Sequence, residues 1–453
     1  SRAQALALNG TTLTANKTAS GGWIKAFNWT ISKDVTPSTW DLFSGDEGTS
    51  AFTVHVTKDA GRDLYYAEGS VCITNGGSVD TYGLAIEDVI EYKTGSGQYQ
   101  QLLSTPLDLT AKPVLKPGES FCYPYKLVFD VVNGASYRNT ANISILNHSG
   151  WLPGGNRCPG SNPCPFGPSP KADFSLPSQP VLQNDTIHVR DSNGAQWEFS
   201  KTDSTTYRTS YSCSKDTGTH TNTVTIDEPG QTIQSASANV TITCHTLEVV
   251  KSAETQFKRT YTWSVDKTAN QPTIALALNQ AYDVSYTVTA SATPRDSDYL
   301  VSGAITITNP SPLSAYINRV DDSLSDGTTV TLDCGTTFPY LLAARQSLVC
   351  RYQQSLLNQN SLTNGAHVTL QNHTYQPDRS ASTTITTDFS AQAPIDFSQA
   401  TITEIDRCST LTDSLQGSFG SICYSDIQNG MWNKTYTRTI GPYSTCGSRS
   451  IVN

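Results

Sequence analysis

Along most of the chain, apolar and polar residues alternate in short runs that are rich in Val, Ile, Thr and Tyr. Examples are residues 246–252 (TLEVVKS), 281–291 (AYDVSYTVTAS) and 304–309 (AITITN). Gly, Pro, Asn and Asp interrupt these runs every few residues, which is typical of antiparallel strands joined by turns. No stretch of useful length has a helical period. The pattern predicts an all-β chain of tandem Ig-like antiparallel β-sandwich domains.

The chain contains an internal repeat with a shift of 234 residues. Residues 25–34 (KAFNWTISKD) match residues 259–268 (RTYTWSVDKT), and residues 69–75 (GSVCITN) match residues 303–309 (GAITITN). The register holds without a gap from residue 12 to residue 75, which chance does not produce. Beyond residue 75, loops of different length change the shift between the two copies. The similarity continues there, with residues 119–127 (ESFCYPYKL) matching residues 346–354 (QSLVCRYQQ) and residues 139–145 (NTANISI) matching residues 364–370 (NGAHVTL).

Each copy of the repeat consists of a larger and a smaller module. The smaller modules are recognised because residues 189–213 (VRDSNG…YSC) resemble residues 411–446 (LTDSLQG…STC). A stretch rich in Pro and Gly joins the first two modules, as expected of a linker. The predicted order is therefore large, small, large, small, with an N-terminal donor strand at 1–10, a large sandwich at 11–152, a linker with a disulfide loop at 153–180, a small domain at 181–245, a large sandwich at 246–392 and an incomplete small domain at 393–453.

The first ten residues, SRAQALALNG, form an alternating run that has no adjacent hairpin partner. Under the 234-residue shift they fall on residues 235–244 (SASANVTITC), the expected closing strand of the first small module. Leu6 and Leu8 then coincide with apolar residues of that strand. We therefore expect Gln4, Leu6 and Leu8 to form the inward face of a strand that completes a small module elsewhere.

The second small module lacks residues for its closing strand. Cys446 corresponds to Cys213, but only GSRSIVN follows it in this sequence. A sandwich without that strand exposes unpaired backbone groups above its apolar core, and a strand of another chain can pair with them. We expect residues 393–453 to accept residues 1–10 of a second copy, a head-to-tail contact that builds fibres. The expected acceptor residues are Tyr436, Tyr443, Cys446 and Ile451.

The chain has 11 cysteines, which is an odd number. The closest pair, Cys158 and Cys164, lies among Pro and Gly with no further Cys or His nearby, so we predict a disulfide loop and no metal site. Cys446 is expected to stay free, because the N-terminal strand carries Gly10 where the first copy has a cysteine. The other predicted disulfides, each worth about 3 kcal/mol in chain-entropy terms, are Cys72–Cys122, Cys213–Cys244, Cys334–Cys350 and Cys408–Cys423.

Charged residues make up only 15% of the chain, and the formal net charge is −9. An acidic chain does not favour a nucleic-acid partner, and no apolar run reaches the length of a membrane span. Disulfides and a surface rich in Ser, Thr and Asn favour an extracellular location. Candidate N-glycosylation sites, which an Asn- and Thr-rich composition also produces by chance, are Asn9, Asn16, Asn28, Asn142, Asn147, Asn184, Asn239, Asn372 and Asn433.

Motifs of catalysis are scarce. Residues 216–218 form the Asp-Thr-Gly triplet of aspartic proteases, but the second triplet that this chemistry needs is missing, so a turn is favoured. Residues 321–328 (DDSLSDGT) lack the full pattern of a calcium loop, and a solvated hairpin turn is preferred. The histidines never occur at ligand spacing, and no nucleophile motif is present. We predict no enzyme activity, no cofactor and no metal.

A resemblance supports the modular interpretation. Residues 412–424 (TDSLQGSFGSICY) and 434–447 (KTYTRTIGPYSTCG) resemble repetitive bacterial secreted surface proteins with Ig-like modules. The arrangement of the terminal strands is similar to that of pili and fimbriae assembled by donor strands, which is an analogy of assembly and not of sequence. The resemblance implies a structural role at the cell surface.

Three functional interpretations remain open. The first is a subunit of an extracellular, cell-surface filament that polymerises with itself. The second is a monomeric multi-domain adhesin or carbohydrate-binding protein, with surface glycans as partners of Tyr65, Tyr66, Tyr99 and Tyr299. The third is a segment of a longer repetitive surface protein, whose neighbouring repeats would complete the small module in cis. Residues 3–5 (Ala-Gln-Ala) also resemble a signal-peptidase site, and cleavage there would shorten the donor strand.

Overall fold

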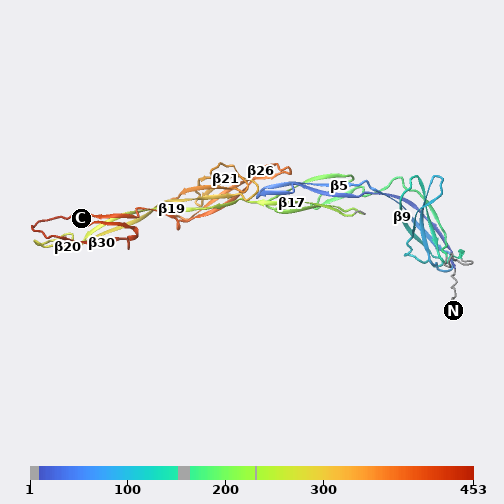
Figure 1. The fold of residues 1–453 in the computed structure, drawn as a ribbon, viewed down its shortest axis with the longest axis horizontal. Helices are drawn as coiled ribbons and strands as arrows, with labels where there is room; N and C mark the ends of the chain where they lie inside the picture. The colour runs from blue at the N-terminus through green and yellow to red at the C-terminus, as the bar shows by residue number, and fades with distance from the viewer. Residues whose placement is uncertain (1–9, 152–163, 230–231) are drawn as a thin grey trace, which may run out of the picture. The chain divides into compact units, whose positions relative to one another are not determined.

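A computed structural model describes residues 10–151, 164–229 and 232–453 of the chain (Figure 1). About 63% of the residues lie in strands. Two single-turn 3-10 helices, Ser149–Trp151 and Tyr424–Asp426, are the helical elements in these ranges. The predicted all-β class with tandem sandwiches is therefore confirmed. The chain divides into two compact units: unit 1 contains residues 1–35, 52–207 and 221–239, and unit 2 contains residues 36–51, 208–220 and 240–453.

Two sheets of unit 1 face each other across one apolar core. The first sheet has the order β1-β6-β2-β12, with β9 also paired to β6, and the second has the order β11-β10-β7-β8. Their bounds are β1 Leu13–Lys17, β2 Ser20–Ala26, β6 Arg62–Asn75, β7 Ala85–Thr94, β8 Gln100–Pro106, β9 Ser120–Phe129, β10 Ala135–Ser144, β11 Lys171–Phe174 and β12 Val181–Gln183.

The alternation of residue types explains how these strands form one sandwich. In β6, Val71 and Ile73 are fully buried, whereas Cys72 between them is only partly buried. Ile143 of β10 and Tyr123 of β9 belong to the same buried cluster, so the core joins both sheets. Each such side chain contributes about 1.5–3 kcal/mol through burial.

A second group of strands combines residues that are far apart in the sequence. One sheet has the order β14-β13-β16-β17-β4, and β3 and β15 both pair with β5. In unit 1, Trp29 and Val54 share a buried cluster with Ile187 and Val224. The bounds are β3 Trp29–Thr36, β4 Thr39–Phe43, β5 Glu47–Lys58, β13 Ile187–Asp191, β14 Gln196–Phe199, β15 Asp203–Ser212, β16 Gly218–Ile226 and β17 Gln234–His245.

Residues 29–58 belong to this second group of strands, whereas the predicted domain boundaries stay a prediction. Residues 29–58, assigned from the sequence to the first large module, pack with residues 187–245. Trp29 belongs to the core of this second group, where it is 1% exposed. The physical reason is that the chain passes from one core to another within two pairs of consecutive strands. The strands β2 and β6 belong to the first sandwich, whereas β3 and β5, which follow β2 and precede β6, contribute side chains to the second core. The 234-residue repeat does not reveal where the chain passes from one core to the other, because both copies make this passage at corresponding residues.

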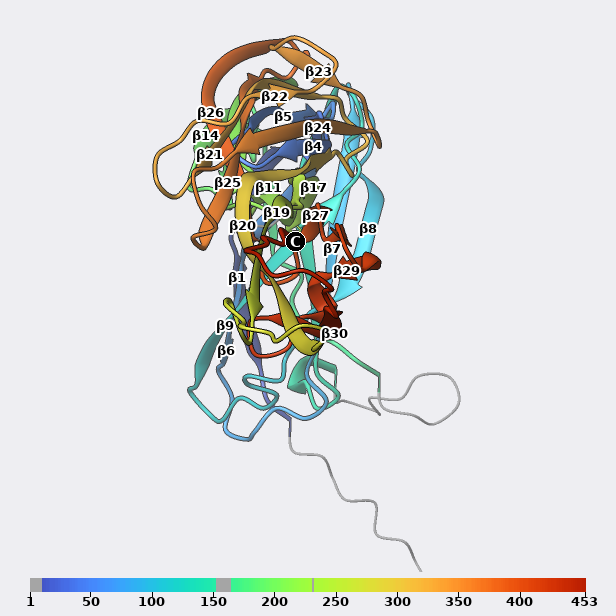
Figure 2. The same ribbon diagram turned by 90° about the vertical axis from the view of Figure 1, so that its left-hand side faces the viewer.

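Unit 2 contains a sandwich that repeats the first one. The strands β18 and β24 pair with β20, and β22 pairs with β24. The strand β25 pairs with β21 and with β26, and Figure 2 shows the three close together. Ile305, Ile317 and Val368 belong to its buried core. The bounds are β18 Glu248–Lys251, β20 Tyr282–Thr308, β21 Ala315–Leu324, β22 Leu332–Asp333, β23 Tyr340–Leu342, β24 Ser347–Ser355, β25 Leu362–Tyr375 and β26 Ala381–Ile395.

The remaining strands of unit 2 repeat part of the second group. The first half of β20 pairs with β30, and β19 pairs with both β20 and β27. The strands β28 and β29 form a separate two-stranded sheet. The bounds are β19 Glu254–Ala269, β27 Thr401–Ile405, β28 Cys408–Asp413, β29 Gly417–Cys423 and β30 Trp432–Ile440.

Candidate functional site

Two lysine–aspartate pairs, one fully buried and one partly buried, show how the last strands correspond to earlier ones. In unit 1, Lys33 Nζ on β3 donates to Asp191 Oδ2 on β13 at 2.6 Å. In unit 2, Lys267 Nζ on β19 donates to Asp413 Oδ2 on β28, also at 2.6 Å. Therefore β3, β13 and β15 correspond to β19, β28 and β30. Hydroxyl groups that donate to the two carboxylates belong to Tyr207 on β15 (2.7 Å) and Tyr436 on β30 (3.0 Å).

The two corresponding sheets differ in their number of strands. In the first copy, β13 pairs with β14 on one side and with β16 on the other, through Val189↔Ile226. In the second copy, β28 pairs with β29, and no other strand among residues 232–453 pairs with it. The strands β16 and β17 of the first copy carry four buried core residues that have no counterpart in this second sheet: Val224, Ile226, Val240 and Ile242.

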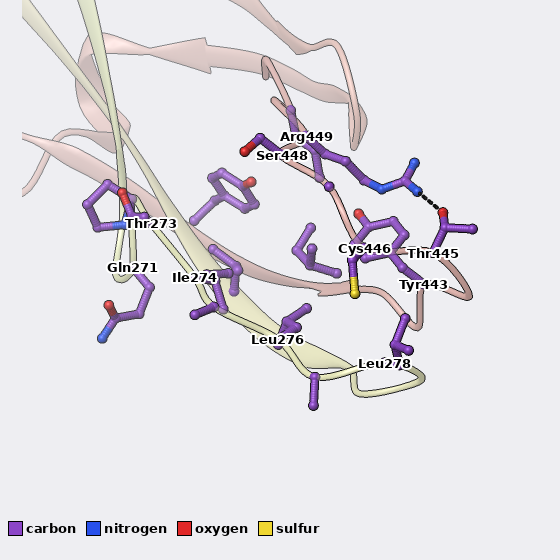
Figure 3. A pocket seen from close by; sticks show the side chains of 18 residues that line it. Gln271, Thr273, Ile274, Leu276, Leu278, Tyr443, Thr445, Cys446, Ser448 and Arg449 are labelled. Carbon is purple, nitrogen blue, oxygen red and sulfur yellow. Dashed lines mark hydrogen bonds between the residues drawn. The ribbon is translucent and has the colours of Figure 1, made fainter.

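A hollow of about 520 Å³ opens in this part of unit 2 (Figure 3). Residues 271–278 form one wall, and the lining also includes Val284 of β20, Ile440 of β30, Tyr443, residues 445–449 and Ile451. Leu278 is 55% exposed and Ile451 is 41% exposed, although both are large apolar side chains. We call this site the acceptor groove, defined by residues 271–278, Val284, Tyr286, Ile440, Tyr443, 445–449 and Ile451.

Residues 273–277 show why the groove lies at the position of β17. The 234-residue shift places them on β4, which pairs in parallel with β17 through Thr39↔Thr241 and Trp40↔Ile242. Without such a neighbour, residues 273–277 form no strand, although Ile274 and Leu276 keep the alternation of β4. The groove therefore contains the counterpart of β4, one of the two strands that flank β17 in the first copy, whereas β16, the other, has no counterpart among the described strands of unit 2.

Three of the four predicted acceptor residues line the groove: Tyr443, Cys446 and Ile451. Tyr436 lies behind it, where its hydroxyl binds Asp413 and its ring stacks on Tyr286 at 5.4 Å. Sequence reasoning missed the wall at 271–278. The alternation of Ile274, Leu276 and Leu278, in register with β4, was the signal that would have identified it.

The predicted donor residues Gln4, Leu6 and Leu8 lie outside the described residues. Their counterparts on β17 are Ala238, Val240 and Ile242, which are 8%, 0% and 2% exposed. Asn239, the counterpart of Ala5, is exposed. A strand with the sequence of residues 1–10 in this register would therefore direct its two leucines into the core.

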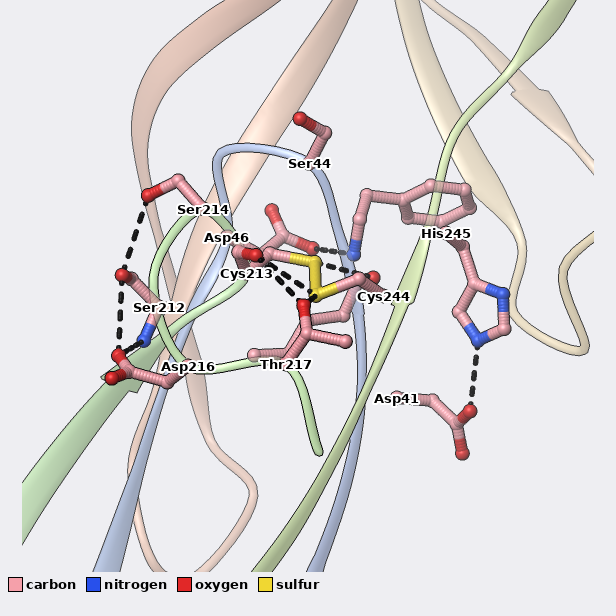
Figure 4. The surroundings of a disulfide bond; sticks show 12 residues. Asp41, Ser44, Asp46, Ser212, Cys213, Ser214, Asp216, Thr217, Cys244 and His245 are labelled. Carbon is pink, nitrogen blue, oxygen red and sulfur yellow. Dashed lines mark hydrogen bonds and ion pairs between the residues drawn. A yellow bond between two sulfur atoms is a disulfide. The ribbon is translucent and has the colours of Figure 1, made fainter. Parts of the chain in front are cut away.

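The disulfide in the first copy marks the end of β17 (Figure 4). Cys213 is bonded to Cys244, and Thr217 Oγ1 lies 3.1 Å from Cys244 Sγ. In the second copy, the corresponding Cys446 is free and exposed within the groove. The neighbouring Asp216 accepts the backbone N–H of Ser212 at 2.7 Å across the turn at 213–215, so the Asp-Thr-Gly triplet connects this turn to β16.

The charges behind the groove hold its rear wall together. Burial would raise the pKa of Asp413, but the Lys267 ammonium and the backbone N–H groups of Leu415 and Gln416 outweigh it and hold that pKa well below its usual range. Burial would also lower the pKa of Lys267, yet hydrogen bonds with Asp413 and Tyr436 raise it overall. Both groups are therefore charged at neutral pH and fix β19 to β28.

The other predicted cysteine pairs can be located in the structure. Cys164 is disulfide-bonded, whereas Cys158, its predicted partner, lies outside the described residues. Cys72 and Cys122 face each other on neighbouring strands β6 and β9. The further disulfides are Cys334–Cys350 and Cys408–Cys423.

Two candidate glycosylation sites have buried amide groups. Asn147 Nδ2 donates to Asp80 O at 2.9 Å, and Asn372 Nδ2 donates to Ser44 O at 2.8 Å. Glycan attachment at these two would have to precede folding. Asn9 lies outside the described residues, and modification of the remaining sequons, Asn16, Asn28, Asn142, Asn184, Asn239 and Asn433, stays a prediction.

The candidate calcium loop forms a hairpin turn. Asp326 Oδ1 accepts the backbone N–H of Thr328 at 2.9 Å, and Asp322 is buried beside Lys251. In the described ranges no three His, Cys, Asp or Glu side chains lie close enough to hold a metal ion. Nor does the described part of the chain contain a helix that is long and apolar enough to span a membrane.

The tyrosines considered for sugar stacking are engaged with neighbouring side chains. Tyr65 stacks on Trp23 at 5.4 Å between ring centroids, and Tyr299 packs edge-on against Phe397 at 5.7 Å. The guanidinium of Arg138 lies 3.8 Å from the ring centroid of Tyr99. The ammonium of Lys126 covers Tyr66 in the same way at 3.6 Å.

Comparisons with known proteins give no family for this chain. No protein family and no curated protein sequence matches it. Among solved structures, Salmonella alpha-2-macroglobulin reacted with methylamine matches at 8% identity and a TM-score of 0.15, over 86% of this chain and 47% of that one. The native conformation of E. coli alpha-2-macroglobulin matches at 7% identity and a TM-score of 0.15, over 80% and 35%. This chain thus spans less than half of either structure, and similarity at this level carries no functional argument.

Proposed function

We propose that this chain is a structural subunit of an extracellular, pilus-like filament. In this proposal residues 1–10 of one copy enter the acceptor groove of the next copy and form the missing counterpart of β17. Each copy then offers one strand and one groove, so the contact is heterologous and extends without closing. The protein's activity is assembly, with a second copy of the chain as its partner.

The observation that carries this proposal is the unfilled position of β17 in unit 2. The groove has exposed apolar walls and a neighbouring segment, 273–277, that lacks the strand with which its counterpart β4 pairs. Residues 1–10 correspond to residues 235–244 within β17 and match their apolar pattern. Backbone pairing supplies affinity and the buried side chains supply register, as in other forms of β-strand addition.

The correspondence also predicts the register of the joint. Since Thr241 pairs with Thr39 in the first copy, Ala7 of one subunit should lie beside Thr273 of the next. Neighbouring strands are about 4.8 Å apart, which is within the Cα separation that a disulfide spans. A cysteine pair at these two positions should therefore link one subunit to the next.

The first test is electron microscopy of the intact chain beside a version that lacks residues 1–10. Filaments from the intact chain alone are expected, with strand density in the acceptor groove. Addition of a synthetic peptide of residues 1–10 to the shortened chain should fill the groove without polymerisation. Dispersed single particles from both versions would refute the filament proposal and leave the adhesin interpretation.

The second test uses oxidative cross-linking in a Cys446→Ser background. Ala7→Cys with Thr273→Cys should give a ladder of disulfide-linked oligomers on a non-reducing gel. Ala5→Cys with Thr273→Cys is the matched control, because it displaces the thiols by two residues along the strand. If a neighbouring repeat of a longer chain fills the groove in cis, neither variant will form the ladder, and the proposed joint would be wrong.

A further inference from the structure

Three polar side chains meet inside the first sandwich of unit 1. Lys17 of β1 and Asp88 of β7 both have fully buried side chains, and Lys17 Nζ lies 2.7 Å from Asp88 Oδ1. Asn139 of β10, also fully buried, donates from Nδ2 to Asp88 Oδ2 at 3.4 Å. One carboxylate therefore touches an amine from one sheet and a carboxamide from the facing sheet.

The corresponding sandwich of unit 2 contains the same three residue types at corresponding positions. Lys251 Nζ of β18 lies 2.9 and 2.8 Å from the two carboxylate oxygens of Asp322 on β21. Asn364 of β25 donates from Nδ2 to Asp322 Oδ2 at 3.4 Å. The lysines and the aspartates are each separated by the same 234 residues, so the repeat maintains the centre as a unit.

Both centres leave the same buried atom without a partner. Asn139 Oδ1 and Asn364 Oδ1 are the buried side-chain oxygens in the described residues that make no hydrogen bond. A buried carbonyl oxygen without a donor is unfavourable and calls for an explanation in a native protein. Its recurrence in both copies, beside a lysine each time, indicates that the carboxamide does something other than accept a hydrogen bond from a neighbour.

The surroundings favour an uncharged amine. Burial lowers the pKa of Lys17 and of Lys251, and burial raises the pKa of Asp88. Tyrosine rings lie over both amines, Tyr125 at 3.7 Å from Lys17 Nζ and Tyr352 at 4.0 Å from Lys251 Nζ, and keep water away. A proton that moves from the ammonium to the adjacent carboxylate leaves a nucleophilic amine next to a polarisable carboxamide.

We propose that each of these centres forms a covalent amide bond between its lysine and its asparagine, Lys17 to Asn139 and Lys251 to Asn364. The Nζ lone pair attacks Cγ of the asparagine, and the neighbouring carboxylic acid protonates Nδ2 as the Cγ–Nδ2 bond breaks. The carboxylate then takes the proton from the new amide nitrogen. The products are a secondary amide and one molecule of ammonia, so atoms and charges balance without an oxidant or cofactor.

Such a bond joins parts that the disulfides do not join. Cys72 and Cys122 link neighbouring strands of one sheet. An amide bond from Lys17 on β1 to Asn139 on β10 links the two facing sheets. It also connects the first strand of the sandwich to a strand near its end in the sequence. Separation of the sheets would then require a covalent bond to break.

A third cluster differs and is left out of the proposal. Lys33 Nζ contacts Asp191, the Tyr207 hydroxyl and Asn222 Oδ1. Here the amide oxygen has a partner, and Asn222 is only partly buried. The proposal rests on the two fully buried centres alone, and it does not depend on filament assembly.

The test is mass spectrometry of the full chain after reduction and denaturation, produced in a host that adds no glycans. The intact mass should lie below the sequence mass by at least two molecules of ammonia. Tryptic peptides of residues around Lys17 and Asn139 should appear as one branched peptide, uncleaved after Lys17. A sequence mass without deficit, with linear peptides at both sites, would overturn the proposal whether or not the chain forms filaments.

The Asn364-Gly365 dipeptide requires its own control, because a succinimide at Asn364 would also release ammonia. That product leaves Lys251 open to trypsin, whereas the proposed amide blocks cleavage there. An ammonia deficit at Asn364 with a normally cleaved Lys251 would therefore count against the cross-link. A branched peptide that contains both residues would support it.

Variants assign the role of the carboxyl group. The intact mass of Asp88→Ala, corrected for the substitution, should exceed that of the unaltered chain by one molecule of ammonia, and its Lys17 peptide should be linear. The peptide that contains Lys251 and Asn364 should stay branched. Asp185→Ala is the matched control, since Asp185 pairs with Lys58 at 2.7 Å in a part-buried position. Its mass deficit should equal that of the unaltered chain. A branched Lys17 peptide in Asp88→Ala would refute the proposed function of the carboxyl group.

Discussion

Replacement of Leu8 by Asp tests the joint at the residue whose counterpart, Ile242, is 2% exposed in the first copy. A leucine in that position buries its whole side chain, which contributes about 1.5–3 kcal/mol. Each 1.4 kcal/mol changes a dissociation constant about tenfold, so loss of Leu8 alone weakens binding by about 10- to 100-fold. An aspartate adds the desolvation of a charge, which makes this range a minimum.

The assay is titration of synthetic peptides of residues 1–10 into the chain that lacks them. The unaltered peptide should bind with 1:1 stoichiometry and protect Cys446 from thiol reagents, because that thiol lies in the groove. The Leu8→Asp peptide should need at least about tenfold more material for the same protection.

Ala5→Asp is the matched control for the direction of each side chain. Its counterpart Asn239 is exposed, so the new carboxylate should stay in water and change binding by about 0.5 kcal/mol or less. A strand that slips by one residue exchanges its two faces. If Ala5→Asp weakens binding as much as Leu8→Asp does, the register taken from β17 is wrong.

Three further predictions concern stability, each measured by urea unfolding. Joint replacement of Cys213 and Cys244 by Ser opens a loop with a sequence separation of 31 and should cost about 3–4 kcal/mol. Because the pKa of Asp413 is lowered in the folded state, its contribution is present above the ordinary carboxyl pKa of 3.8 and is lost as the pH falls below it; Asp413→Asn should flatten that acid dependence. Ile307→Ala should cost about 2–5 kcal/mol, whereas Val349→Ala on the exposed face should change stability by about 0.5 kcal/mol or less. Equal effects of these last two would contradict the assigned core.

The sequence was sufficient for features that depend on local pattern and on the repeat. Alternating residues identify the strands, and the 234-residue shift relates Lys17 to Lys251. The odd cysteine count pointed to Cys446, which is free in the structure. These features follow from properties that each copy shows separately, so no knowledge of packing is needed.

Features that depend on packing between distant segments were not accessible in this way. Residues 29–58 continue one module in sequence but share a core with residues 187–226, and the alternation is the same on either side of that change. The centre of Lys17, Asp88 and Asn139 combines strands from facing sheets. The repeat relates the individual residues of the two centres, since Asp88 and Asp322 also lie 234 residues apart. Only the folded chain shows that the lysine, the aspartate and the asparagine of one copy are in contact.

The strand β20 connects the acceptor groove to the sandwich that contains Lys251. Its first half, with Val284 in the groove lining, pairs with β30, and its second half pairs with β24 and with β18. A donor strand that is pulled from the groove would therefore load β20, and through it the ladder to β18. A bond from Lys251 to Asn364 would hold β18 to the facing sheet at that point. Under tension, the non-covalent joint between subunits would then separate before this sandwich opens. In single-molecule pulling on linked subunits, the unaltered chain should show no opening of this sandwich, whereas Asp322→Ala should show it.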